Sequence, residues 1–154
     1  MSSSIYRWVI AWAGLALCVG LVATITMWPA PVDQGYGAAI DKVLTMLHNR
    51  GVPEWFGYSK LEFTSNIVMF IPLGFFLTLS FPHKYWWIAL ILIPALSGSI
   101  EWAQGQFLSQ RFSSPLDVIA NTTGGYIGVL CAMALWGIVN ARDEHKLRSH
   151  NVVT

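Results

Sequence analysis

Apolar residues occur along this chain in four long runs that contain no charged side chain. A membrane-spanning helix needs about 20 mostly apolar residues to cross a hydrocarbon core about 30 Å thick. Within lipid the backbone must be helical or form a closed barrel, and none of the four runs alternates between polar and apolar residues. The pattern therefore predicts four transmembrane helices, at about 6–28, 60–81, 85–106 and 115–140.

The segment between the first two predicted spans has the periodicity of a surface helix. Ile40, Val43, Leu44 and Leu47 follow the spacing i, i+3, i+4, i+7, and polar residues occupy the positions between them. This pattern predicts an amphipathic helix at about 36–50 on the membrane surface. The expected fold is an all-α membrane protein, a bundle of four transmembrane helices with an amphipathic interfacial helix between helices 1 and 2.

Composition supports a membrane protein and narrows the classes of partner. Of the 154 residues, 55% are hydrophobic and 11% are charged, whereas an ordinary soluble domain has about 25% charged residues. The formal net charge of +1 provides no basic field for a nucleic acid. We expect a single transmembrane domain at 1–141, followed by a polar cytoplasmic tail at 142–154.

The two cysteines give no sign of a disulfide or a metal site. Cys18 and Cys131 lie inside apolar runs, and neither has a CxxC partner or a nearby histidine. The sequence therefore predicts no metal and no cofactor. Membrane lipids are the partners that the composition implies, and the oligomeric state stays open.

Lysine and arginine residues in the short loops indicate the orientation, because cytoplasmic loops carry an excess of them. The residues near one end of the predicted bundle are Arg7, Lys84, Arg142, Lys146 and Arg148, and those near the other end are Lys42, Arg50, Lys60 and Arg111. Five against four favours a cytoplasmic location for the first group. We therefore expect a multi-pass protein of the cell membrane with both termini in the cytoplasm.

Spans two and four open with the same arrangement of polar residues. Ser59 and Ser114 each precede an acid by three residues, which is the spacing of a capping box at a helix start. An asparagine follows each acid by one helical turn, so acid and amide share a helix face. The two pairs are Glu62 with Asn66 and Asp117 with Asn121.

Four further residues are candidates for helix packing. Gly124 and Gly128 form a small-xxx-small stripe in span four, where another helix can approach closely. Pro72 lies inside span two, where a proline typically causes a kink. Gly74 follows it by two residues and joins this group.

Polar residues of three spans are expected at the same depth. Glu101 and Gln104 lie near the outer end of span three, and a rise of 1.5 Å per residue places them level with Asn66 and Asn121. An ionised group inside a membrane is costly and usually faces the bundle interior or a wet cavity. The predicted ligand-binding cluster is Asn66, Glu101, Gln104, Arg111, Asp117 and Asn121, with Asp41, Lys42 and Glu62 as secondary candidates.

A purely structural interpretation of these residues stays open. In that interpretation Asp117 only caps its helix, Asn66 and Asn121 only join helices, and Glu101 only pairs with Arg111, the nearest cation in the sequence. We expect the pair between Glu101 and Arg111 in either case, because the buried acid needs a partner.

Two segments resemble the signatures of a known family. Residues 66–74, Asn-Ile-Val-Met-Phe-Ile-Pro-Leu-Gly, resemble the N-x-x-x-F-x-P-L-G signature of VanZ-like membrane proteins. Residues 101–104, then Arg111, then residues 117–124 resemble the E-x-x-Q … R … D-x-x-x-N-x-x-G segment of the same family. The resemblance extends over about 41–128, and both the order and the spacing of the motifs agree.

One position departs from the family pattern. Many members have a D-K-x-x-H segment ahead of span two, and this chain has Thr45 where the histidine is expected after Asp41 and Lys42. His48 lies one helical turn later. A role that depends on the family histidine is therefore in doubt here.

The resemblance implies reduced susceptibility to teicoplanin, a glycopeptide antibiotic that binds cell-wall precursors outside the membrane. We rank first a surface protein that binds a lipid-linked wall precursor, an anionic lipid or a lipophilic antibiotic. An intramembrane enzyme on a lipid-linked phosphate, with Glu101 or Asp117 as general acid or base, is the alternative. No nucleophile motif supports the enzyme and no catalytic residue is assigned, while a small transporter ranks third.

Overall fold

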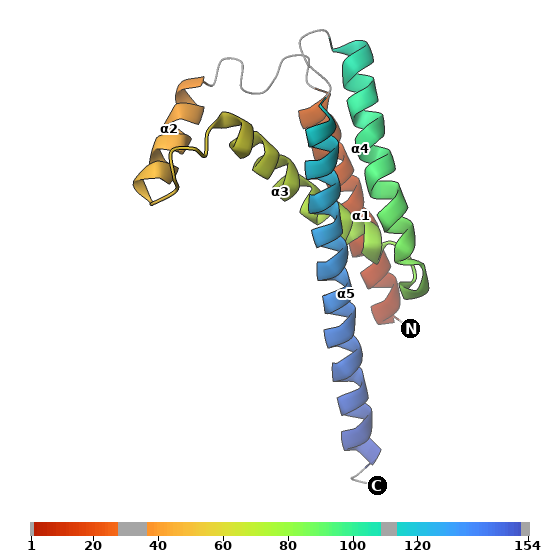
Figure 1. The fold of residues 1–154 in the computed structure, drawn as a ribbon. Helices are drawn as coiled ribbons and strands as arrows, with labels where there is room; N and C mark the ends of the chain where they lie inside the picture. Colours follow the sequence, from red (N-terminus) through yellow and green to blue (C-terminus); the bar gives the residue numbers. More distant parts are fainter. Residues whose placement is uncertain (1, 28–36, 109–113, 152–154) are drawn as a thin grey trace.

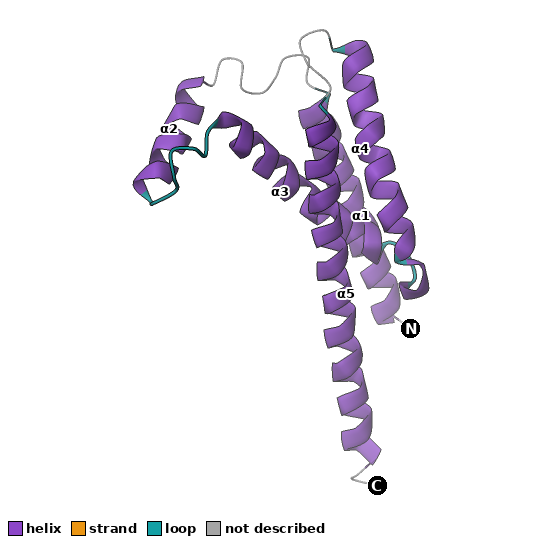
Figure 2. Ribbon diagram, viewed as in Figure 1, coloured by secondary structure: helices purple, strands orange, loops and turns teal. Residues whose placement is uncertain are grey.

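The described part of the computed structural model of the protein is almost entirely helical (Figures 1 and 2). It describes residues 2–27, 37–108 and 114–151, with side chains described from residue 5 to residue 142 inside these ranges. In chain order the elements are α1 (Ser2–Thr26), α2 (Gly37–Asn49), α3 (Tyr58–Leu79), the 3-10 helix η1 (His83–Tyr85), α4 (Trp87–Phe107) and α5 (Pro115–Asn151).

The predicted fold class is confirmed. Helices α1, α3, α4 and α5 are each long and apolar enough to cross a membrane. Helix α2 lies between the first two of them in the chain and apart from them in space (Figure 1). Its part-buried residues include Ile40, Leu44 and Leu47, whereas Lys42 and Asn49 are exposed, as expected for an amphipathic helix.

The four long helices run in alternating directions through one bundle (Figure 1). Helices α1 and α4 end, and α3 and α5 begin, at the same end of the bundle. The N-terminus and the turn between α3 and α4 lie at the opposite end. Helix α3 crosses α5 obliquely, and this pair forms the most extensive contact between helices.

Glycines allow the backbones of α3 and α5 to touch. A Cβ atom added to Gly124 would collide with the backbone of Ile67, and one added to Gly128 would collide with the backbone of Ile71. Gly74 of α3 lies against the backbone of α5 in the same way. The predicted small-xxx-small stripe thus lies at the closest helix crossing, where dispersion contacts between backbones take the place of side-chain packing.

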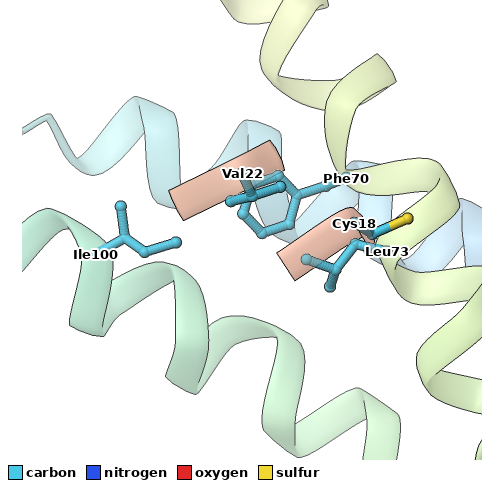
Figure 3. Close-up of a cluster of buried hydrophobic side chains, with 5 residues drawn as sticks. All are labelled: Cys18, Val22, Phe70, Leu73 and Ile100. Carbon is cyan, nitrogen blue, oxygen red and sulfur yellow. The ribbon is translucent and has the colours of Figure 1, made fainter. Parts of the chain in front are cut away.

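The apolar core is divided between two clusters of buried side chains. Cys18 and Val22 of α1 meet Phe70 and Leu73 of α3 and Ile100 of α4 in the first cluster (Figure 3). The second cluster, nearer the turn between α3 and α4, comprises Ala89, Ile93 and Val129. Many other large apolar side chains point outward.

Exposed apolar residues cover the outside of the bundle. Ile10 and Leu17 of α1 are 64% and 65% exposed, and Leu130 of α5 is 64% exposed. A soluble monomer rarely exposes contiguous apolar surface of this kind. Lipid chains would cover it in a bilayer, so the distribution of side chains agrees with the hydropathy of the four helices.

The two predicted capping boxes have different outcomes. Helix α5 begins at Pro115 as predicted, and the Ser114 hydroxyl accepts a hydrogen bond of 3.3 Å from the Leu116 N–H. The predicted cap at Ser59 is wrong, because α3 begins one residue earlier, at Tyr58, with no side-chain cap. The carbonyl of Gly57 already accepts the N–H groups of the next turn, so the helix starts before the serine.

The ends of three other elements also follow from local chemistry. Gly51, with φ of 95°, terminates α2 in a left-handed conformation that a residue with a Cβ rarely adopts. Helix α4 begins at Trp87, slightly later than predicted, because η1 occupies the turn before it. Pro72 lies inside α3 without ending it, and its side chain is exposed whereas Gly74 is buried. Residues 143–151 of the predicted tail continue α5 as a helix.

Replacing Gly128 with alanine is expected to destabilise the bundle. The new methyl group would press on the backbone of α3, which cannot move aside as a flexible side chain can, and overpacking of this kind costs about 1–3 kcal/mol. Thermal unfolding of the purified protein in detergent micelles measures the change. Gly137→Ala is the matched control, because a Cβ there meets nothing within 4 Å on the same helix. Equal stability of the two variants would contradict the close helix crossing.

Candidate functional site

Polar side chains of α3, α4 and α5 meet toward the end of the bundle where α3 and α5 begin (Figure 1). We call this group the interhelical polar cluster. Its members are Asn66, Ser97, Glu101, Gln104, Asp117 and Asn121. Each hydrogen bond made by a side chain of this cluster joins two different elements of the chain, so the cluster ties the helices together.

Asn66 of α3 and Asp117 of α5 form the first contact. The Asn66 Nδ2 donates a hydrogen bond of 3.0 Å to Asp117 Oδ1, and both residues are half-buried. A hydrogen bond to a carboxylate is stronger than one between neutral groups, because the acceptor carries charge. The acid and amide therefore meet across two helices.

Glu101 takes over a capping role at the start of α5. Its side chain is only 6% exposed, and its Oε2 accepts a hydrogen bond of 2.9 Å from the Ser114 N–H. In an ordinary capping box the acid three residues after the cap would accept that N–H. Here the acceptor comes from α4, while Asp117 of α5 accepts the amide of Asn66. Each carboxylate therefore accepts a hydrogen bond from another element: Glu101 from the residue before α5, and Asp117 from α3.

Gln104 closes the end of α1. The side chain is 5% exposed, and its Nε2 donates a hydrogen bond of 2.8 Å to the backbone carbonyl of Thr26, the last residue of α1. The last carbonyls of a helix have no donor within the helix. Gln104 therefore supplies a donor that the end of α1 needs.

Asn121 is the most deeply buried amide of the cluster. It is 2% exposed, and its Nδ2 donates a hydrogen bond of 3.0 Å to the Ser97 hydroxyl of α4. Among the described residues, its buried Oδ1 has no hydrogen-bond partner, and neither does the buried hydroxyl of the adjacent Thr122. An unpaired buried polar atom costs about 1–3 kcal/mol. The unmet acceptor marks a position where a donor from water or a ligand would be stabilised.

Of the other predicted site residues, those that the structure describes lie outside the interhelical polar cluster. Arg111 lies outside the described residues, and with it the expected pair with Glu101. Asp41 and Lys42 are exposed on α2, apart from the long helices. Glu62 is exposed on α3, one turn before the asparagine of the cluster.

Helix α2 carries a shallow surface depression of its own, which is largely open. Lys42, Thr45, Asn49 and Arg50 are among the residues that line it. The Thr45 hydroxyl donates to the carbonyl of Asp41 at 2.7 Å, so the threonine that replaces the family histidine is bonded within its own helix.

His48 contacts the loop after α2. Its Nε2 lies 3.2 Å from the carbonyl oxygen of Phe56, and because that oxygen can only accept, the Nε2 carries the proton. Lys60 of α3 contacts Trp55 of the same loop. Its Nζ donates to the Trp55 carbonyl at 3.2 Å and lies 3.7 Å from the centre of the Trp55 ring. These two bonds hold the loop against α2 and α3, so His48 does not serve the interhelical polar cluster.

Three bonding groups of the site were missed by the sequence analysis. Ser97 lies one turn before Glu101 on α4, and this i, i+4 spacing is a signal that could have identified it. The Thr26 carbonyl and the Ser114 N–H are backbone groups, for which side-chain patterns give no signal. Among the described residues, no group of three or more His, Cys, Asp or Glu could hold a metal ion.

Comparison with known families gives one match. A family model described as VanZ/LLP1 matches residues 13–137. The matched region contains every residue of the interhelical polar cluster and most of each long helix. Neither the curated proteins nor the solved structures gave a match to the chain.

Removing the Glu101 carboxylate is expected to weaken the end of the bundle. Glu101→Ala leaves the Ser114 N–H without its acceptor, which costs about 1–3 kcal/mol. Glu101→Gln keeps an oxygen in reach of that N–H, so its loss of stability should be smaller. Thermal unfolding in micelles compares the two, with Glu54→Ala as an exposed control. If Glu101→Ala unfolds no earlier than Glu54→Ala, the capping role of Glu101 is wrong.

Proposed function

This chain belongs to the VanZ/LLP1 family, and we therefore propose that it lowers susceptibility to glycopeptide or lipoglycopeptide antibiotics by binding an envelope ligand. The ligand is a lipid-linked wall precursor or another envelope molecule with a polar or anionic headgroup. It binds at the outer face of the cell membrane, at the end of the bundle that carries the interhelical polar cluster. The chain itself is a multi-pass membrane protein with four apolar helices.

The observation that carries the proposal is the unmet acceptor of Asn121. Its buried Oδ1 has no partner within the described part of the chain, and it lies between two helices that also carry the carboxylates of the cluster. Sugar hydroxyls and peptide amides of a wall precursor are donors that suit such an acceptor. The acyl or polyprenyl part of the same ligand would remain in the surrounding lipid. An amphiphile thus fits the position of the cluster better than a soluble molecule does.

A basic residue in the segment between α4 and α5 supports a ligand that also carries phosphate or carboxylate. Arg111 belongs to this segment, and Lys42 lines a shallow depression on α2. Arginine recognises phosphate and carboxylate groups through two parallel hydrogen bonds. We assign Arg111 to the charged group of the ligand and the amides of the cluster to its uncharged donors.

The bonding of the two carboxylates favours binding over acid–base chemistry. Glu101 accepts a backbone N–H and Asp117 accepts an amide N–H, so both serve contacts between helices. A general base must be aligned with the proton that it abstracts, whereas one oxygen of each carboxylate is held in a contact between helices. An intramembrane enzyme is therefore the second hypothesis for the function, and a small transporter is the third.

Arg111→Gln is expected to abolish protection in living cells. Loss of a charge-assisted hydrogen bond costs about 1.5–3 kcal/mol, which corresponds to roughly a 10- to 150-fold loss of affinity. The minimal inhibitory concentration of teicoplanin in a deletion strain that carries the variant should fall to that of the deletion strain. Immunoblots of membranes confirm equal protein levels.

The matched control for this experiment is Arg50→Gln, which removes the same charge from the exposed end of α2. That variant should keep most of the protection. Unchanged protection with Arg111→Gln would contradict the assigned role of Arg111. Loss of protection with both variants would indicate that protection depends on positive charge in general and not on a defined contact of Arg111.

Purified protein in lipid nanodiscs should bind a lipid-linked wall precursor saturably. Glu101→Gln should keep the fold and weaken binding several-fold, because it removes a charge that helps to orient the cluster. Microscale thermophoresis measures affinity, and mass spectrometry of the precursor after incubation detects any chemical change. Absence of saturable binding would overturn the proposal, and a new product that disappears with Glu101→Gln would establish the enzyme instead.

A further inference from the structure

The end of the bundle opposite the interhelical polar cluster contains a cavity of about 340 Å³. Its wall is built from three places in the chain: the start of α1, the turn between α3 and α4, and the second half of α5. This size lies at the low end of the range of about 300–1,000 Å³ for small-molecule sites. The cavity can therefore take a headgroup and the first part of its chains.

Two groups that can hold an anion line this cavity. Arg7 is exposed on the first turns of α1, and among the residues whose side chains are described none forms a salt bridge with it. His83 packs against Trp136, with ring centres 4.6 Å apart and planes at 59°. Trp136 is only 8% exposed, so it fixes the imidazole at the mouth of the cavity. A guanidinium and an imidazole from different elements thus face one space.

The rest of the wall is apolar. Leu79 of α3, Leu135 of α5 and Ala11 of α1 are among its apolar lining residues. Trp8 lines it as well and is 41% exposed. Tryptophan is enriched where a membrane protein meets the headgroup layer. The cavity therefore combines a guanidinium and an imidazole with an apolar wall.

We infer that this cavity binds an anionic phospholipid, with the phosphate between Arg7 and His83 and the upper acyl chain against Leu79 and Leu135. A soluble anion would bind Arg7 and His83 and leave the apolar wall without a partner. A zwitterionic lipid would fill the wall but gain less from the positive charge of Arg7. Basic pockets between transmembrane helices are known to bind anionic headgroups. This site shares no residue with the interhelical polar cluster, so it stands independently of the proposed antibiotic function.

Native mass spectrometry of the protein, released from micelles that contain phosphatidylglycerol and phosphatidylcholine, tests the inference. Wild-type protein should retain one phosphatidylglycerol molecule in preference to phosphatidylcholine. Arg7→Gln should lower that preference about fivefold, which is the effect of one basic residue at a membrane surface. Lys84→Gln is the charge-matched control, because Lys84 belongs to the same turn as His83 but does not line the cavity.

A second pair of variants separates the cavity from the surface charge. Leu135→Trp would fill the cavity without changing any charge, and Leu135 is 39% exposed, so the change should not disturb the core. It should lower phosphatidylglycerol retention as much as Arg7→Gln does. Leu130→Trp is the control, because Leu130 is 64% exposed on the same helix and outside the cavity.

Three results would overturn the inference. Equal losses with Arg7→Gln and Lys84→Gln would reduce it to a general field of positive charge. Full retention with Leu135→Trp would show that the cavity holds no lipid. Equal retention of phosphatidylcholine and phosphatidylglycerol by the wild-type protein would show that the headgroup charge is not recognised.

Discussion

The structure depends on one constraint: a polar group inside a bilayer must find a partner within the protein, because lipid supplies none. The interhelical polar cluster meets this constraint with bonds between helices, except at the Asn121 Oδ1, for which the described residues supply no donor. Glu101 caps α5 from α4, and Gln104 closes the end of α1. The same side chains therefore hold the helices together and supply hydrogen-bond partners for the backbone groups at helix ends. A helix that rotated or slid would break both at once.

Close packing and polar bonding also support each other at the crossing of α3 and α5. Gly124 touches the backbone of Ile67, the residue that follows Asn66. The bond of 3.0 Å between Asn66 and Asp117 joins the same two helices. Short side chains can bridge two helices only where the helices pack closely, so the glycine contacts and this bond support the same packing. The family signature around Asn66 and the glycine stripe thus describe two halves of a single contact.

The sequence was sufficient for the spans, the surface helix and most members of the cluster. The bounds of a span and the depth of its polar residues are properties of a single helix, so the pattern of apolar residues in the sequence predicts both. The partners could not be predicted, because they depend on how helices are rotated against one another. Ser114 shows the limit: the spacing to Asp117 suggested a local capping box, yet the N–H went to Glu101 of another helix. The prediction at Ser59 was wrong because the turn before it already supplied the first carbonyl of α3.

The two ends of the bundle differ in chemistry, and this difference bears on orientation. Carboxylates and amides gather where α3 and α5 begin, whereas Arg7 and His83 share a cavity at the other end. Anionic lipids give the cytoplasmic leaflet a negative surface potential that attracts basic residues. The proposed cytoplasmic location of this end would bring Arg7 to the leaflet with the negative potential, where the lipid cavity would use the same charge. In that orientation the interhelical polar cluster would face outward, as the proposed binding of an envelope ligand requires.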